Sequence, residues 1–343
     1  MTSLIWLFVG FVVVPTTIWI ALATHYHFRW LWLRWFVSLF PLVVVGTSLA
    51  VLPLVPWVLA VWFGLLVITI AWWFSLRPKS DLDWAMGMEV LPRAEIVGDT
   101  LCVRQFRNFS YEAEDKPITR YEERTYDLSR LSSLDYFLTH WSGPVMAHTL
   151  VSFGFDDGQF LCVSVEARRQ RWQSYSPLWG LFRAYHLMFV LGDERDIVRL
   201  RTNIRRDRVY MYRLRLPPEH LRRLLLDYAS RVEKLATQPA WYNTVSSNCT
   251  TNLFYRGHAS VPWWMKLGIF LNGFSGRTMY RLGYLSDSLP FKELQARSDI
   301  RERALAAGDA ADFSQQIRAQ LVMPALCISG GHGTRTRNPL RGN

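Results

Sequence analysis

The chain has 343 residues, half of them apolar and 16 of them Trp, and it carries a formal net charge of +11. The charge is placed unevenly, because residues 1–76 contain only two ionised side chains, Arg29 and Arg34. This composition excludes an ordinary soluble protein and predicts a membrane-embedded part followed by a globular part.

Three uncharged stretches of the first part are long enough to cross a bilayer. A helix needs about 20 apolar residues to span roughly 30 Å of hydrocarbon. Pro53 and Pro56 lie between the second and third stretches, where they favour a turn. Several tryptophans lie near the expected ends, which suits the headgroup layer. We therefore predict transmembrane spans at about 4–24, 36–53 and 57–76.

The positive charges around these spans predict an orientation. Arg29 and Arg34 lie between the first two spans, and Arg77 and Lys79 follow the third. With three spans, these two places are on the same side of the membrane, and the turn between the second and third spans, on the other side, is almost uncharged. Cytoplasmic loops of membrane proteins carry an excess of Lys and Arg. The count therefore favours a cytoplasmic position for the globular part, by a small margin.

Residues 80–325 have mixed polarity and frequent turn signals, as expected of one globular domain. The transmembrane region then covers 1–79, and the polar, Gly- and Arg-rich residues 326–343 form a disordered tail without an assigned function. Within the domain, short β-branched and aromatic runs predict strands. Asp127–His140 is expected to form a short helix, and an amphipathic helix is expected to begin at Pro218.

The clearest hairpin joins the runs AHTLVSFGF and QFLCVSVEAR through the turn DDG. Gly158 supplies the left-handed conformation that such three-residue loops favour. This turn pairs Phe155 with Gln159, and the same register pairs His148 with Glu166. His148 and Glu166 should therefore be cross-strand neighbours on one face.

Cys249 follows the capping-type sequence SSN and precedes a short apolar face, which predicts a thiol in the first turn of a helix. Unpaired N–H groups and the helix dipole favour thiolate there. With His148 as the base and Glu166 as the group that orients the imidazole, the residues have the types of a catalytic triad. The alternative is structural: Cys249 as a small core residue, His148 as a satisfied sheet residue, and Glu166 as a partner of nearby arginines.

Two further features suit a lipid surface. Arg168 and Arg169 follow the hairpin, and attraction to anionic headgroups is favoured over nucleic-acid binding because no nucleic-acid motif accompanies them. The run 261–274 contains Trp263 and Trp264 and is either a core helix or an interfacial helix close to the cysteine. The remaining cysteines and histidines lack metal-ligand spacing, so neither a metal nor a disulfide framework is predicted.

Several segments carry a resemblance to a known family. In chain order they are RNFSY, YEERTYDL, DYF, AHTLVSFGF, SVEARR, GDERD and SSNCTT, and they cover about residues 95–256. Together they resemble the Lnb-type family of bacterial membrane proteins. That family is similar to circularly permuted papain-like, NlpC-type thiol enzymes, in which the histidine strand precedes the cysteine helix. The resemblance implies an α+β fold, with a bundle of three transmembrane helices before a permuted papain-like domain that has an antiparallel sheet and a Cys-bearing helix.

The resemblance also implies an activity. It is the cofactor-free transfer of a fatty acyl chain from a phospholipid, through a Cys249 thioester, to the α-amino group of a diacylated lipoprotein. His148 would be the base and Glu166 the orienting group, while backbone N–H groups at the start of the cysteine helix would stabilise the oxyanion. The Asn248-Cys249 pair resembles the Asn-Cys pair at the nucleophile of the related enzymes, and Asn248, Arg168, Arg169, Trp263 and Trp264 are expected to bind substrate.

The location implied by the resemblance is the bacterial inner membrane, with several spans and a periplasmic catalytic domain, in contrast to the charge count. The expected partners are the phospholipid donor, the lipoprotein acceptor and membrane lipid, without nucleic acid. Two other functions stay open: a membrane-anchored cysteine peptidase or amidase of the cell envelope, and a non-catalytic membrane scaffold.

Overall fold

The structure is a computed structural model that describes residues 7, 9–51, 56–254 and 272–324. The predicted tail lies outside the described residues. By its internal contacts the chain divides into two compact units. The first unit comprises Met1–Ala85, Arg169–His186 and Trp241–Thr244, and the second comprises Met86–Arg168, Leu187–Ala240 and Val245–Asn343.

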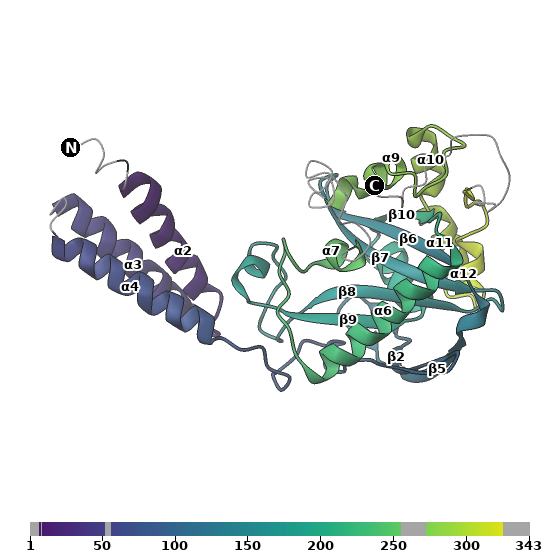
Figure 1. The fold of residues 1–343 in the computed structure, drawn as a ribbon, viewed down its shortest axis with the longest axis horizontal. Coiled ribbons are helices and arrows are strands. Elements are labelled where there is room, and N and C mark those ends of the chain that lie inside the picture. The colour runs from purple at the N-terminus through teal and green to yellow at the C-terminus, as the bar shows by residue number, and fades with distance from the viewer. Residues whose placement is uncertain (1–6, 8, 52–55, 255–271, 325–343) are drawn as a thin grey trace. The chain divides into compact units, whose positions relative to one another are not determined.

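The first unit contains the helices of the apolar region. A π-helical turn, Val9–Val13, continues into α2 (Val14–His25), and α3 (Leu31–Val51) and α4 (Pro56–Ser75) follow (Figure 1). Among the described residues, the one helix that is long and apolar enough to cross a membrane is Leu31–Ser48, whereas Val9–His25 and Leu59–Ser75 are shorter apolar helices. A helix therefore stands at each of the three predicted spans, and one of them meets the length and composition of a membrane span.

Aromatic and cationic side chains tie segment 169–186 to the helix ends within the first unit. The Arg34 guanidinium lies 5.4 Å from the centre of the Trp172 ring and 4.9 Å from that of Trp179. Arg183 donates a hydrogen bond of 2.6 Å to the Trp73 carbonyl and lies over the ring of the same residue. Such cation–π contacts are worth about 0.5–2 kcal/mol each. These two arginines thus have defined structural roles.

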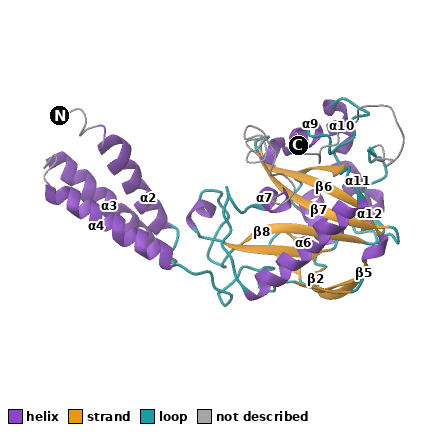
Figure 2. Cartoon of the chain, viewed as in Figure 1, coloured by secondary structure: helices purple, strands orange, loops and turns teal. Residues whose placement is uncertain are grey.

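The second unit is built on a mixed eight-stranded sheet in the order β1-β2-β9-β8-β7-β6-β10, with β5 paired to β2 (Figure 2). We expected an antiparallel sheet, and this was wrong at one place, because β2 and β9 pair in parallel at Arg107 and Gly192. The sheet strands are β1 (Arg93–Val97), β2 (Thr100–Arg107), β5 (Tyr121–Asp127), β6 (Leu131–Ser142), β7 (Met146–Phe155), β8 (Phe160–Arg168), β9 (His186–Gly192) and β10 (Arg208–Arg213), and β3 (Ser110–Ala113) and β4 (Lys116–Ile118) form a separate pair.

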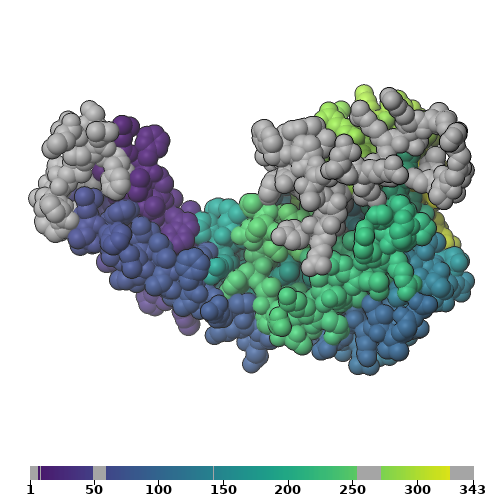
Figure 3. Space-filling view, viewed as in Figure 1, coloured from purple at the N-terminus to yellow at the C-terminus, as the bar shows by residue number. Residues whose placement is uncertain are grey.

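Helices cover both faces of this sheet. The amphipathic helix α6 (Pro218–Thr237), confirmed as predicted, packs on one face, where the Tyr228 ring contacts Phe153 and Phe189 edge-on. Its polar side is turned outward and forms part of the green surface in the space-filling view (Figure 3). The opposite face holds a core cluster to which α5 (Glu194–Arg199), α11 (Arg301–Ala307) and α12 (Phe313–Gln316) contribute. That cluster includes Phe137, Leu150, Cys162, Met188, Ile197, Val198, Ile300, Ala304 and Phe313.

The β7–β8 hairpin has the predicted register. Phe155 N donates to Gln159 O at 3.0 Å, and Gly158 has a φ of 85° in the turn. Phe153 pairs with Leu161 further along the ladder, so the same register brings Glu166 opposite His148. The hairpin prediction is confirmed.

The helix expected at Asp127–His140 was wrong. A 3-10 turn, Leu128–Arg130, leads directly into the long strand β6. This strand lies between β7 and β10, and Leu134, Tyr136, Phe137 and Leu138 are all at most 2% exposed. A strand that is buried on both faces does not alternate between apolar and polar residues, so its pattern is not distinguishable from that of a short buried helix.

The segments RNFSY and GDERD meet in one buried network. The Arg107 guanidinium donates to both carboxylate oxygens of Asp196, at 2.8 and 3.0 Å. Phe109 N and the Tyr111 hydroxyl donate to the same carboxylate at 2.9 and 2.7 Å. Asp196 is fully buried, and these four donors satisfy it. The network fixes α5 against the end of β2.

A second buried network holds the same first turn of α5 through Glu194. Arg318 donates to both carboxylate oxygens of Glu194, at 2.6 and 2.7 Å, and to Asp135 at 2.8 Å. Both carboxylates have fully buried side chains, and Arg213 is a second partner of Asp135. The arginine therefore compensates two charges that water does not reach.

Removing this arginine should be far more costly than removing an exposed one. In Arg318→Met, Glu194 keeps its buried charge but loses its cation, which costs about 3–5 kcal/mol of unfolding free energy. The matched change Arg297→Met removes the exposed pair with Glu293 and should cost at most about 0.5 kcal/mol. Unfolding of the two detergent-solubilised variants would be compared by circular dichroism. Equal unfolding temperatures would contradict the assigned role of Arg318.

Candidate active site

The hairpin brings His148 and Glu166 together as predicted. His148 Nε2 on β7 lies 3.3 Å from Glu166 Oε1 on β8. Ser164 Oγ bridges the two groups, at 2.8 Å from His148 Nε2 and 2.7 Å from Glu166 Oε1. The side chains of His148 and Glu166 are 17% and 25% exposed, so water screens their interaction only in part.

Arg201 is a further hydrogen-bond and ion-pair partner of the Glu166 carboxylate. It belongs to a π-helical turn, Leu200–Ile204, that follows α5 directly, and its Nη2 donates to Glu166 Oε1 at 2.8 Å. Its Nη1 donates to Ile197 O at 2.7 Å, which fixes the guanidinium. Burial alone would raise the pKa of Glu166, but His148, Arg201 and the Ser164 hydrogen bond outweigh it and hold that pKa well below its usual value. No spacing in the sequence links Arg201 to Glu166, so this role was not predicted.

Cys249 begins the helix α7 (Cys249–Phe254), as the capping sequence predicted, and it is 4% exposed. Asn248 Oδ1 accepts from the backbone N–H groups of Thr250 and Thr251, both at 2.8 Å. Asn248 therefore acts as the helix cap. The Cys249 thiol is a hydrogen-bond partner of His148. Because Nε2 of His148 already faces Ser164 and Glu166, Nδ1 is the ring nitrogen left for the thiol.

The charges of these groups favour a reactive thiolate. Burial would raise the pKa of Cys249, but the neighbouring His148 outweighs it and lowers that pKa to about 6. Burial would likewise lower the pKa of His148, but Glu166 outweighs it and raises that pKa to about 9. At neutral pH the site therefore holds a thiolate and an imidazolium, the state in which a cysteine is nucleophilic.

Asn272 is a further polar group beside the thiol. It begins the 3-10 turn Asn272–Phe274, and its Nδ2 lies 3.8 Å from Cys249 Sγ. Ala147 N donates to Asn272 Oδ1 at 2.9 Å, and Nδ2 donates to the carbonyl of the same alanine. A Cβ on the next residue, Gly273, would lie 2.1 Å from Pro144 O, so a side chain there would push the turn away. Neither spacing nor composition marked Asn272 in the sequence.

The arginines expected to bind substrate have backbone partners. Arg168 is 5% exposed and donates to Met88 O and Glu89 O, both at 2.7 Å, and burial lowers its pKa to about 10. Arg169 belongs to the first unit and donates to Gln173 O at 3.5 Å. Their role in substrate binding stays a prediction.

Trp263 and Trp264 lie outside the described residues, as does most of the run 261–274. Their predicted role in lipid binding therefore stays a prediction.

A buried cysteine, a histidine and a carboxylate thus lie together on an α+β scaffold, with the residue types and charges that nucleophilic thiol chemistry requires. Residues 118–269 match the model of the Lnb N-terminal periplasmic domain. This match covers less than half of the chain and agrees with the Lnb-type resemblance of the motifs, and the matched domain and the apolar helix Leu31–Ser48 indicate a membrane-associated protein. Cys249, His148 and Glu166 all lie inside the matched range. Searches of curated proteins and of solved structures give no match.

The thiolate can be tested without a substrate. Cys249 should react with iodoacetamide with a midpoint at about pH 6, because His148 stabilises its thiolate. Cys102 is the internal control, since burial and Glu123 raise its pKa, so its reaction should require alkaline pH. Peptide mass spectrometry after short pulses at each pH reports both cysteines in one sample.

The same measurement on Glu166→Gln tests whether the Cys249 thiolate depends on Glu166 through His148. Without the carboxylate the pKa of His148 falls, less imidazolium is present, and the midpoint for Cys249 should move upward by about one pH unit or more. An unchanged midpoint would show that Glu166 does not sustain the ion pair.

Proposed function

We propose that this protein is a membrane-bound thiol acyltransferase that moves a fatty acyl chain from a phospholipid to the α-amino group of bacterial lipoproteins. The observation that carries the proposal is the Cys249 thiolate, paired with His148 and supported by Glu166, inside a domain of the Lnb family. We also propose a permuted papain-like arrangement. The order of the histidine strand β7 before the cysteine helix α7 supports it.

In the first step the Cys249 thiolate attacks the ester carbonyl of the phospholipid. A carbon–sulfur bond forms, and the carbonyl oxygen becomes an oxyanion. When the tetrahedral intermediate collapses, the ester carbon–oxygen bond breaks, and the His148 imidazolium gives its proton to the leaving alkoxide of the lysophospholipid. The products of this step are a Cys249 thioester and a neutral imidazole.

In the second step the α-amino group of the lipoprotein attacks the thioester. The neutral His148 accepts a proton from the attacking nitrogen, and the carbon–sulfur bond breaks to return the thiolate. The amide remains on the lipoprotein, and the thiolate–imidazolium pair is restored for the next turnover. Glu166 keeps the imidazole in one orientation in both steps.

Asn272 is the donor best placed to stabilise the oxyanion. The Thr250 and Thr251 N–H groups at the start of α7 already bond to Asn248, so these two amides are engaged in the helix cap. Asn272 Nδ2 is 3.8 Å from the sulfur. A donor at this position meets an oxygen that develops beside the carbon bonded to the sulfur.

The proposed membrane arrangement places α2, α3 and α4 across the bacterial inner membrane and the thiol domain in the periplasm. At about 1.5 Å per residue, the 21 residues of α3 extend over about 31 Å and the 20 of α4 over about 30 Å. The description of the matched domain as periplasmic supports the orientation. An acceptor lipoprotein anchored in the outer leaflet would then face the site.

The first test is mass spectrometry of a reporter lipoprotein in cells that lack their own N-acyltransferase. Coexpression of the intact chain should add a third acyl chain to the N-terminal peptide, and Cys249→Ala should abolish this addition because the thioester is not formed. Cys102→Ala is the matched control and should retain the activity. A peptide that stays diacylated with a folded, membrane-inserted intact chain would refute the acyltransferase.

A second test addresses Asn272. Loss of one oxyanion donor costs about 10²–10³-fold in kcat, so Asn272→Ala should lower the acylation rate by about 10²-fold. The rate of Cys249 alkylation at neutral pH should change little, since the thiolate depends on His148. Parallel loss of both rates would instead assign Asn272 a role in building the thiol site.

A further inference from the structure

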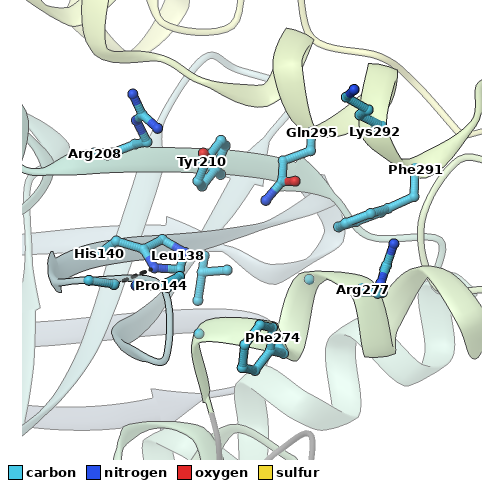
Figure 4. Close-up of a pocket in the computed structure, with 13 residues that line it drawn as sticks. Leu138, His140, Pro144, Arg208, Tyr210, Phe274, Arg277, Phe291, Lys292 and Gln295 are labelled. Atoms are coloured by element: carbon cyan, nitrogen blue, oxygen red, sulfur yellow. Dashed lines mark hydrogen bonds between the residues drawn. The ribbon is translucent and has the colours of Figure 1, made fainter.

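A cavity lies in the same unit as the candidate active site. Its volume is about 620 Å³, which is in the range of small-molecule sites. Strands β6 and β10 form one side of it, and helices α9 (Ser275–Arg281) and α10 (Phe291–Ser298) form the other (Figure 4). The side chains used below are those of His140, Arg208, Tyr210, Arg277, Lys292 and Gln295.

The lining of this cavity is cationic. Arg208, Arg277 and Lys292 contribute three positive charges, and among the described residues that line the cavity there is no Asp or Glu. Arg208 has one distant partner, Asp299, at 3.6 Å. In the described part of the chain, Arg277 and Lys292 form no ion pair, and the Arg277 guanidinium lies 5.7 Å from the Phe291 ring centre. The cavity therefore suits an anion.

Neutral groups complete the lining. Burial lowers the pKa of His140, whose Nδ1 lies 3.3 Å from Gly143 O, so this ring adds no charge at neutral pH. The Tyr210 ring and the Gln295 amide face the space between the strands and α10 (Figure 4). A guanidinium, an ammonium, a phenol and an amide together offer donors to the several oxygens of a phosphate.

The cavity adjoins the thiol site through the turn Asn272–Phe274. Gly273 and Phe274 line the cavity, whereas Asn272 contacts Cys249 Sγ. The sheet also connects the cavity to the thiol site. Leu138 lines the cavity and pairs with Thr149 on β7. The Thr149 hydroxyl lies 3.2 Å from the hydroxyl of Thr250, the residue after Cys249. One turn of the chain, Asn272–Phe274, therefore contacts both the cavity and the nucleophile.

We infer that this cavity binds the phosphate of the phospholipid acyl donor. The inference rests on the proposed function, since it assumes that a phospholipid ester is the electrophile. In a glycerophospholipid a few covalent bonds separate the phosphate from the ester carbonyls, which matches the adjacency of the cavity and Cys249. The phosphate would fix the headgroup while the ester reaches the sulfur. Free inorganic phosphate carries the same kind of negative charge and is the alternative ligand of this cavity.

Binding is measured on the full chain in a non-ionic detergent, with Cys249→Ala as background so that no turnover occurs. The probe is dihexanoylphosphatidylglycerol, followed by isothermal titration calorimetry. Arg277→Gln combined with Lys292→Gln should weaken its affinity about tenfold or more, because two charge-assisted contacts to phosphate are lost. The control, Arg281→Gln with Arg297→Gln, changes the same charge on the same two helices outside the cavity and should alter the affinity less than about twofold.

Two further probes separate the sources of the phosphate. Dihexanoylglycerol lacks the phosphate, so its affinity for the double variant should equal its affinity for the control variant. Inorganic phosphate should bind more weakly than the lipid. An unchanged lipid affinity in the double variant, with its unfolding temperature retained, or an equal loss in the control overturns the inference. Inorganic phosphate that binds as tightly as the lipid would make the cavity a free-phosphate site and also overturns it.

The reporter-lipoprotein test keeps the two proposals apart. If the double variant loses lipid affinity while the intact chain adds no acyl chain to lipoprotein, the acyltransferase fails and the phosphate site stands. If the intact chain acylates lipoprotein and the double variant does so equally well at limiting donor, with unchanged lipid affinity, the acyltransferase stands and the phosphate site fails.

Discussion

The half-buried charge of Glu166 is the constraint on which the candidate site depends. Burial by itself favours a neutral thiol and a neutral imidazole. With the carboxylate in place, Arg201, Glu166, His148 and Cys249 form a row of alternating charges, positive, negative, positive and negative, whose sum is zero. Each charge is stabilised by its neighbour, and the thiolate depends on His148, whose imidazolium depends on Glu166. The hydroxyl of Ser164 adds a neutral bridge inside this row.

The packing of α5 explains how the Arg201 guanidinium is held beside Glu166. Its π-helical turn is the direct continuation of α5, and the two buried networks hold α5 through Asp196 and Glu194. Both of these acids belong to the segment GDERD, and Arg107, the partner of Asp196, belongs to RNFSY. These motifs therefore act at a distance from the chemistry. They fix the helix that places the guanidinium, while AHTLVSFGF, SVEARR and SSNCTT supply the groups of the site themselves.

The sequence predicts the parts of the site that local structure determines, and it does not predict the parts that depend on long-range packing. A tight turn with a left-handed glycine fixes a register, so the pairing of His148 with Glu166 followed from local rules, as did the position of Cys249 after its cap. Strand β6 was mistaken for a helix because burial of both its faces removes the alternating pattern. Arg201 and Asn272 reach the site through long-range packing, to which no spacing rule applies. The phosphate cavity likewise exists only after β6, β10, α9 and α10 have met.

The positive-inside count treats every cation alike, whatever it touches. In the first unit Arg34 lies over two tryptophan rings, and Arg183 pairs with the ring and carbonyl of Trp73. Arginines held in this way serve the packing of the unit in either compartment, so they carry less information about orientation than free loop cations. With Arg34 discounted, Arg29, Arg77 and Lys79 still lie on the side of the globular part, so the count is weakened but keeps its direction. The periplasmic placement therefore rests on the matched domain, and cation–π packing of Arg34 lowers the weight of the opposing charge count without reversing it.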